Sequence, residues 1–266
     1  MTRRRLDAEL VRRGLVASTT EARSAVEEGS VLVAGRSADN PSSLVSTADP
    51  VEIVASGGRF ASRGGDKLDA ALGRFGIRVA GRACLDAGAS TGGFTDCLLQ
   101  HGAARVVAVD VGYGQLAWSL RSDQRVVVLD RANVRSLEPH DLPFVPDLVT
   151  ADLSFISLRA VVPALARVSA EGADLLLLVK PQFEAEREEV ESGGVVRDPI
   201  VWRRSIEGVM DAGVAVGLSA QGLTAPPVLG PAGNVEFFVW ACKGGAGAPP
   251  DVEAAVQEGR RIGGLA

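Results

Sequence analysis

Residues 85–94 read "LDAGASTGGF" and follow an apolar segment that predicts a buried strand. Gly88, Gly92 and Gly93 would let the backbone approach a ligand closely where the chain turns into the next helix. The spacing is not the GxGxxG of dinucleotide binders, and no Lys-Ser/Thr follows as a P-loop requires. The loop therefore predicts a small-molecule site, while NAD and ATP are disfavoured as its ligands.

Acidic residues end the strands that follow this loop. Asp110 ends "RVVAVD", Asp130 ends "RVVVLD" and Asp152 ends "LVTAD". Ligands bind outside the carboxyl ends of the strands in open parallel sheets, where one carboxylate can accept both hydroxyls of a ribose. Asp110 suits that role. A lone Asp after a strand is often only a turn or cap residue. Three of them beside a glycine loop instead predict a nucleoside ligand.

The pattern acidic–x–Gly–x–Ser–x–Gly–Gly–Phe resembles motif I of S-adenosylmethionine-dependent methyltransferases. The resemblance implies S-adenosyl-L-methionine as the cofactor. It also implies a set of cofactor-binding residues along the loop and the strand ends: Asp86, Gly88, Ala89, Ser90, Thr91, Gly92, Gly93, Phe94, Asp110, Val111, Gly112, Asp130, Asn133 and Asp152.

Lysine is rare in this chain, since only three of the 28 basic residues are Lys. Lys180 ends the apolar run "DLLLLV", Lys67 precedes the first strand, and Glu236 interrupts the last apolar strand. Buried charges need partners, and two Lys with Asp152 and Glu236 would be charge-balanced. One interpretation is a purely structural pair of ion pairs. The other is that Lys180 orients or deprotonates a hydroxyl that is to be methylated, which arginine cannot do because it keeps its proton.

Residues 1–56 predict a small unit of two helices and short strands. "RLDAELVRRGL" places apolar residues on one helical face and arginines around it. The formal net charge of −5 excludes a uniformly basic nucleic-acid binder, so RNA binding would need a local patch. A solvated helix face is the alternative reading of the same charges. The arginines of the candidate patch are Arg3, Arg4, Arg5, Arg12 and Arg13.

Beyond a linker at 57–64, strands and helices alternate over residues 65–243, which predicts an α/β domain with helices on both faces of a parallel sheet. Residues 244–266 begin flexibly and are expected to form a peripheral tail. Cysteine and histidine spacings predict no metal site, and no signal peptide or apolar run of membrane-spanning length occurs. We expect a cytoplasmic monomer without metal or membrane partners.

The four residues Lys67, Asp152, Lys180 and Glu236 resemble the Lys-Asp-Lys-Glu catalytic tetrad of FtsJ-type ribose 2′-O-methyltransferases. "SRGGDKL", "CLDAGASTGGFTD", "ADLSFISL", "LVKPQFE" and "GPAGNVEFF" resemble the TlyA (haemolysin A) family more closely still. That resemblance implies a Rossmann-like class I methyltransferase, with a seven-stranded, mostly parallel sheet and an antiparallel last strand. It also implies an S-four RNA-binding domain at the N-terminus and 2′-O-methylation of cytidine in 16S and/or 23S rRNA of ribosomal subunits.

The sequence also departs from that family at positions expected to meet RNA. Thr19 and Asn40 stand where relatives often carry basic residues, with Arg23 as the candidate replacement, and Arg63 completes the predicted RNA-binding set. The loop 184–194 is strongly acidic and is expected to repel phosphate. The main alternative is a non-catalytic RNA-binding or ribosome-assembly protein with this fold. A small-molecule methyltransferase would leave the basic N-terminal unit unexplained, and a membrane-lytic protein has no sequence support.

Overall fold

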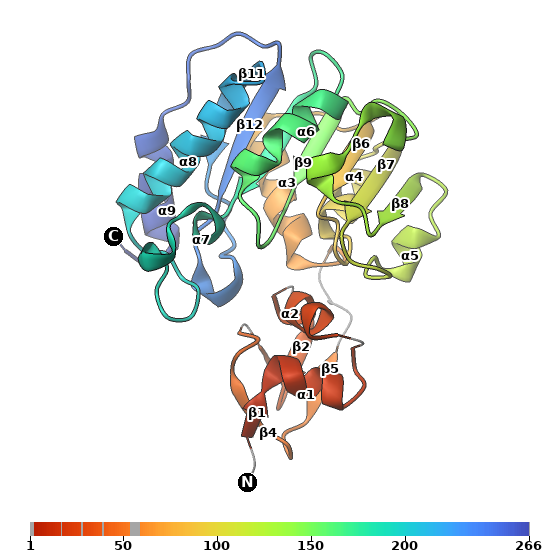
Figure 1. Ribbon diagram of the computed structural model, residues 1–266, viewed down its shortest axis with the longest axis vertical. Coiled ribbons are helices and arrows are strands. Elements are labelled where there is room, and N and C mark those ends of the chain that lie inside the picture. Colours follow the sequence, from red (N-terminus) through yellow and green to blue (C-terminus); the bar gives the residue numbers. More distant parts are fainter. Residues whose placement is uncertain (1–2, 17, 28, 39, 54–58, 266) are drawn as a thin grey trace.

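The computed structural model describes residues 3–16, 18–27, 29–38, 40–53 and 59–265, so part of the expected linker lies outside the described residues. Its elements form an N-terminal unit (residues 3–53) below a larger sheet unit (residues 59–265) in Figure 1. The N-terminal unit contains two helices and five short strands: β1 (Arg3–Arg5), α1 (Leu6–Arg12), α2 (Thr19–Glu27), β2 (Val31–Val33), β3 (Arg36–Ser37), β4 (Leu44–Ser46) and β5 (Val51–Ile53).

The N-terminal unit has a small core of its own. Leu6 and Leu10 of α1 pack with Val26 of α2 and Val31 of β2, and all four are completely buried. Strand β1 pairs with β4, while β2 lies between β3 and β5. The apolar face predicted for the first helix is therefore the face that closes this core, while Arg12 on its outer side stays half exposed.

The sheet unit is built on seven strands in the order β11-β12-β10-β9-β6-β7-β8. Only β12 runs antiparallel to its neighbours β10 and β11, which confirms the predicted mostly parallel sheet with an antiparallel last strand. The strands are β6 (Ala83–Ala87), β7 (Arg105–Asp110), β8 (Val126–Asp130), β9 (Leu148–Ala151), β10 (Asp174–Val179), β11 (Leu218–Thr224) and β12 (Phe237–Lys243).

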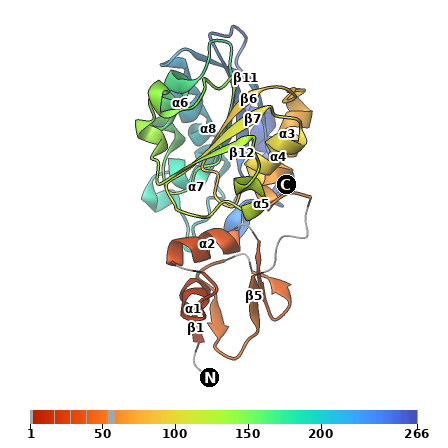
Figure 2. The same cartoon turned by 90° about the vertical axis from the view of Figure 1, so that its right-hand side faces the viewer.

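Helices cover both faces of this sheet. Figure 2 shows the sheet between α6 and α8 on one side and α3 and α4 on the other. The first group is α6 (Val162–Val168), α8 (Pro199–Val214) and α9 (Val252–Ile262), with the short α7 (Pro181–Glu184) at the lower edge. The second group is α3 (Arg63–Phe75), α4 (Gly93–Gln100) and α5 (Trp118–Arg121). No helix among the described residues is long and apolar enough to span a membrane.

Side-chain alternation along β10 explains its apolar run. Leu175 and Leu177 pack on the α6/α8 face, whereas Leu176 and Leu178 pack on the α3/α4 face, so the strand is buried on both sides. Lys180 follows Leu178 by two residues and therefore belongs to the α3/α4 face. The same alternation places Asp152 and Glu236 on that face, because Leu148 of β9 and Phe238 of β12 pack there.

The C-terminal segment corrects one expectation. Residues 244–266 were expected to be peripheral, but they carry α9, whose Ala255 and Val256 are 3% and 1% exposed and belong to the core on the α6/α8 face. Glu258 of this helix accepts hydrogen bonds from the Thr224 hydroxyl and the Ala225 amide, each at 3.0 Å. The Gly- and Pro-rich residues 244–250 suggested a flexible tail, although the helix that follows them has an apolar face.

Candidate functional site

The glycine loop between β6 and α4 sits at the carboxyl end of the sheet. Gly88 has φ +86°, and a Cβ there would lie 2.3 Å from the backbone oxygen of Asp152. A Cβ on Gly93 would lie 2.2 Å from the Ser62 hydroxyl just before α3. Glycine is thus required for the loop to touch both the end of β9 and the start of α3. The loop therefore lies directly against the elements that carry Asp152 and Lys67.

Asp86 is completely buried below this loop. Its carboxylate accepts hydrogen bonds from the Thr95 hydroxyl at 2.6 Å and the Thr150 hydroxyl at 3.2 Å. Burial raises the pKa of Asp86 to about 7, although both threonine hydrogen bonds work against the shift. The residue therefore supports the loop from inside the protein and does not line the cavity described below.

We expect Asp86→Asn to reduce the pH dependence of stability. Since the folded pKa of about 7 lies above the unfolded value of about 3.9, the folded state binds more protons between these limits. The free energy of unfolding should thus fall as pH rises from about 4 to about 7, by an amount on the order of 4 kcal/mol. Asparagine carries no such charge, so the free energy of unfolding of the variant should rise relative to that of the wild type as pH increases across this range.

Urea unfolding between pH 4 and 8, followed by tryptophan fluorescence, measures this difference because all three tryptophans lie in the sheet unit. Asp123→Asn is the matched control. The pKa of Asp123 is lowered by its hydrogen bonds with Arg125, so this carboxylate stays ionised throughout the range. Parallel pH courses for Asp86→Asn and wild type would contradict the assignment.

The acids of the next two strands already hold protein partners. Asp110 accepts hydrogen bonds from the backbone amides of Ser90 at 2.9 Å and Gly112 at 2.7 Å, one on each oxygen. Each oxygen keeps a second acceptor site. Asp130 instead forms an ion pair with Arg121 at 2.8 Å. Asn133 caps the short helix at 134–136 through the Arg135 amide.

A cavity of about 510 Å³ opens at the carboxyl end of the sheet, beside the glycine loop. The predicted cofactor residues that line it are Gly88, Ala89, Ser90, Gly93, Phe94, Asp110, Val111, Gly112 and Asp152. Five others do not line it: Asp86, Thr91, Gly92, Asp130 and Asn133. The cavity also has Ser18 and Thr20 in its wall, so the beginning of α2 in the N-terminal unit contributes to it.

The four residues predicted as a tetrad form two ion pairs. Lys180 Nζ lies 2.5 Å from Asp152 Oδ1, and Lys67 Nζ lies 2.6 Å from Glu236 Oε2. Lys67, Asp152 and Lys180 line the cavity, whereas Glu236 lies behind Lys67 and its side chain is 0% exposed. Three of the four can therefore meet a ligand, and the fourth holds one of them.

The charges of the two pairs act on one another. Burial alone would raise the pKa of Asp152, but the positive charges of Lys180 and then Lys67 outweigh it and hold that pKa below its usual value. Lys180 Nζ also donates to the Ser154 hydroxyl at 3.2 Å. The Lys180 ammonium is thus held between a carboxylate and a hydroxyl in the cavity wall, where it can donate a hydrogen bond to a bound ligand.

The acidic loop 184–194 is largely compensated by arginines of the same domain. Glu189 and Arg204 form an ion pair, and Glu191 lies 3.3 Å from Arg197. Glu184 is 7% exposed and lies 3.1 Å from Arg159. The uncompensated charge of this loop is thus smaller than its composition suggests.

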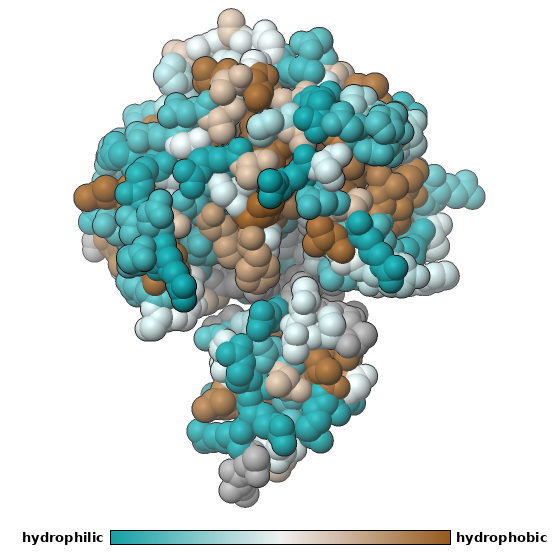
Figure 3. Space-filling model, viewed as in Figure 1, coloured by the Kyte–Doolittle hydropathy of each residue, from teal (hydrophilic) through white to brown (hydrophobic). Residues whose placement is uncertain are grey.

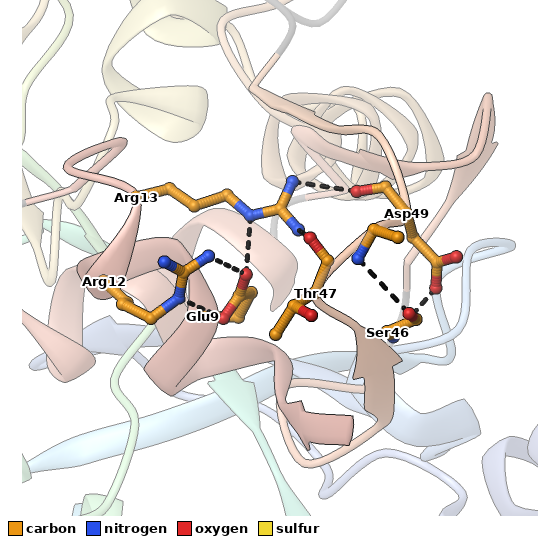
Figure 4. Close-up of polar contacts among 7 residues, drawn as sticks. Glu9, Arg12, Arg13, Ser46, Thr47 and Asp49 are labelled. Atoms are coloured by element: carbon orange, nitrogen blue, oxygen red, sulfur yellow. Dashed lines mark hydrogen bonds and ion pairs between the residues drawn. The ribbon is translucent and has the colours of Figure 1, made fainter. Parts of the chain in front are cut away.

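The predicted RNA-binding arginines differ in how many hydrogen bonds and ion pairs they make within the protein. Figure 4 shows Arg12 and Arg13 sharing Glu9, with Arg13 also donating to the backbone oxygens of Thr47 and Asp49. Hydrogen bonds, first from Arg12 and then from Arg13, lower the pKa of Glu9 to about 2. Arg13 is consequently a structural clasp between α1 and the chain after β4.

Asp7 plays a similar part for two others. Arg5 lies 2.7 Å and Arg23 lies 3.2 Å from the same Asp7 oxygen, yet both side chains stay nearly half exposed. Arg3 and Arg4 are exposed on β1 and have no side-chain partner among the described residues. Figure 3 shows a largely hydrophilic surface over this unit. Arg63 stands apart from these, in the cavity wall.

Sequence reasoning missed the aromatic rim of the cavity. Phe155 is 65% exposed with φ +64°, and its ring lies 5.2 Å from that of Phe183. Tyr113 is 70% exposed, and the Arg131 guanidinium lies 4.5 Å from its ring centre. The available signal was an aromatic residue in each of two loops that follow strands, in a chain with 5% aromatic residues.

Cysteine and histidine spacings predict no metal site, but the fold brings His101 near Asp69 and Cys97, with potential ligand atoms within 4.8 Å of one another. His101 Nε2 lies 2.6 Å from one Asp69 oxygen, and Arg59 lies 2.8 Å from the other. Burial raises the pKa of the Cys97 thiol. Both oxygens of Asp69 are thus used within the protein, and we assign no ion to this cluster.

Comparison with known proteins agrees with this geometry. The FtsJ-like methyltransferase model matches residues 60–243, and the S4 domain model matches residues 4–51. The 16S/23S rRNA (cytidine-2′-O)-methyltransferase TlyA of Mycobacterium tuberculosis is 52% identical over 90% of this chain and 89% of its own length. Hemolysin A of Brachyspira hyodysenteriae is 36% identical over 88% of this chain and 98% of its own length.

A solved structure of a candidate hemolysin of Streptococcus thermophilus superposes with a TM-score of 0.75 at 36% identity, covering 98% of this chain and 97% of that one. The FtsJ-like match alone spans well over half of the chain, and it contains the glycine loop, most of the cavity wall and both ion pairs. This chain therefore belongs to the FtsJ-like methyltransferase family, as a member that carries an S4 domain ahead of its methyltransferase domain.

Proposed function

We propose that this protein is an S-adenosylmethionine-dependent rRNA (cytidine-2′-O)-methyltransferase that acts on ribosomal subunits. The observation that carries the proposal is the pair of lysines held by Asp152 and Glu236 in the wall of a cavity next to the glycine loop. The high identity to the relative named as a 16S/23S rRNA methyltransferase supports rRNA as the substrate class. We also propose the division into residues 1–56, 57–64, 65–243 and 244–266, with α9 packed on the main domain.

The residues present fit S-adenosylmethionine. Gly88 and Gly93 leave no room for a Cβ, so the backbone itself forms the cavity wall there, and the Ser90 loop is held by Asp110. The free acceptor sites of Asp110 suit two ribose hydroxyls. Asp130 and Asn133 lie outside the cavity wall: Asp130 pairs with Arg121, and Asn133 caps the turn whose Val134 lines the cavity. When bound, the cofactor supplies an electrophilic methyl group.

The chain's own groups would then prepare the nucleophile. Lys180, fixed by Asp152 and Ser154, binds the target 2′-hydroxyl. As an ammonium it would orient the hydroxyl by donating a hydrogen bond to its oxygen, and as a neutral amine, after losing a proton to solvent, it would take the hydroxyl proton. Lys67 adds positive charge beside the developing alkoxide and is held by Glu236, so Glu236 acts as a positioning residue. All four groups come from one chain, in keeping with the expected monomer.

RNA would be met by the N-terminal unit and by the cavity rim. Arg3 and Arg4, together with the half-exposed Arg5, Arg12 and Arg23, offer charge for phosphates. The exposed rings of Phe155 and Tyr113 suit stacking on an unpaired base next to the reacting ribose. Because Ser18, Thr20 and Arg63 share the cavity wall, the RNA-binding unit and the methyltransferase site would face one substrate together.

The test is transfer of radiolabelled methyl from S-adenosylmethionine to 30S, 50S and 70S particles that lack this modification. Label should appear in rRNA and map to the 2′-oxygen of cytidines. Label on the base instead of the ribose would refute the 2′-O assignment. Cofactor binding without label on any particle would favour the alternative, a non-catalytic ribosome-assembly protein with this fold.

A further inference from the structure

Two segments leave the sheet side by side at the cavity. Residues 153–158 follow β9 and carry Ser154, and residues 180–184 follow β10 and carry Lys180. Sheet pairing between β9 and β10 is recorded only from Asp174–Leu148 to Leu177–Ala151, before either segment begins. The relative placement of Lys180 and Ser154 must therefore be fixed by side chains.

Glu184 supplies most of that fixation. Its side chain is 1% exposed, and Oε1 accepts from the Leu158 amide at 2.6 Å while Oε2 accepts from the Ser157 hydroxyl at 2.5 Å. Arg159 donates through Nε to Oε2 at 3.1 Å and through Nη2 to the Glu184 backbone oxygen at 2.8 Å. The Ser157 and Leu158 donors belong to the other segment, and Arg159 follows it directly. Glu184 is thus a crosslink between the two catalytic segments.

The segment that Glu184 holds contains a strained residue. Phe155 has φ +64°, a left-handed conformation that costs a non-glycine residue on the order of 1–3 kcal/mol and persists only where its surroundings enforce it. The neighbouring Ser154 accepts the hydrogen bond from Lys180. The Phe155 ring contacts Phe183, which is one residue before Glu184. Releasing the crosslink should let this turn relax, which would move Ser154 and Phe155 relative to Lys180.

We propose that Glu184 is a positioning residue that locks segment 153–158 onto segment 180–184 and so sets the placement of Lys180 for methyl transfer. This role rests on the proposed function. It gives the first acid of the acidic loop a task in the active site, in place of the phosphate repulsion that the sequence suggests.

The experiment compares Glu184→Ala and Glu184→Gln with wild type. Glu189→Gln is the matched control, because Glu189 lies in the same acidic loop but pairs with Arg204 of α8. Amide hydrogen exchange of residues 153–158, cofactor affinity and the single-turnover rate on ribosomal particles are measured. Glu184→Ala should raise exchange in 153–158 and lower the rate about 10²-fold, with cofactor affinity within about threefold of wild type. Glu184→Gln keeps an acceptor for the Leu158 amide and should recover part of the rate.

A merely structural role is separated by adding Ser154→Ala. If Glu184 acts by holding Ser154, the double variant should lose little more rate than Glu184→Ala alone, whereas independent effects would multiply. Unchanged exchange in 153–158 would overturn the crosslink. Raised exchange with an unchanged rate would overturn the positioning role. A wild type that labels no rRNA defeats the proposed function and the role in transfer with it, while exchange still decides separately whether the crosslink exists.

Discussion

Lys180→Arg should abolish methyl transfer to rRNA while the protein still binds S-adenosylmethionine. The Lys180 ammonium lies 2.5 Å from Asp152 in the cavity wall, so an arginine there would keep the charge and the ion pair. Guanidinium does not give up its proton, so the variant keeps the charge but cannot act as a base. Loss of a positioned acid–base group typically costs about 10²–10⁴-fold in rate.

Lys243→Arg is the matched control for this result. Lys243 contacts the Ser169 backbone oxygen and Glu171, each at 2.9 Å, and has no place in the cavity wall. The single-turnover rate and cofactor affinity of this variant should equal those of wild type. Activity retained in Lys180→Arg would remove proton transfer by lysine from the mechanism and leave only electrostatic stabilisation.

Much of this site could be predicted because sheets impose simple geometry. The carboxyl ends of parallel strands meet at one edge, and alternation fixes which face each residue takes. Lys180 lies two residues beyond Leu178, and Asp152 follows Thr150 in the same way, so both had to reach the α3/α4 face. The glycine loop was legible for a similar reason, since Gly88 permits a contact that any Cβ would block.

Two kinds of feature could not be predicted from the sequence. One is a contact between segments that are distant in the chain, and the other is the inward orientation of a side chain that belongs to a binding motif. Asp86 belongs to the motif that predicts cofactor binding, yet its carboxylate points into the protein toward Thr95 and Thr150. Glu184 looked like one acid of a charged loop, and only the fold brings Ser157 to it. The clasp of Glu9 by Arg12 and Arg13 was within reach, because these residues lie three and four apart on one helix.

Lys67→Met should destabilise the sheet unit strongly, and adding Glu236→Gln should restore most of the loss. The Lys67 and Glu236 side chains are 8% and 0% exposed, so removing the lysine strands a buried carboxylate. The other oxygen of Glu236 has no hydrogen-bond partner among the described residues, so no second contact can compensate. Breaking such a pair costs about 3–5 kcal/mol, whereas replacing both members is often nearly neutral.

Urea unfolding of the two single variants and the double variant gives the coupling free energy, and the same three proteins are assayed for methyl transfer. If Lys67 contributes only to the fold, Lys67→Met/Glu236→Gln should regain activity together with stability. If Lys67 supplies charge to the reacting hydroxyl, the double variant should be stable and inactive, with cofactor affinity preserved. The second outcome is the one expected, because Lys67 reaches the cavity wall and lowers the pKa of Asp152, while Glu236 lies behind it. On that outcome, neutral residues could replace the Lys67–Glu236 pair with little loss of stability, and the role of the pair is to place the Lys67 charge in the cavity wall.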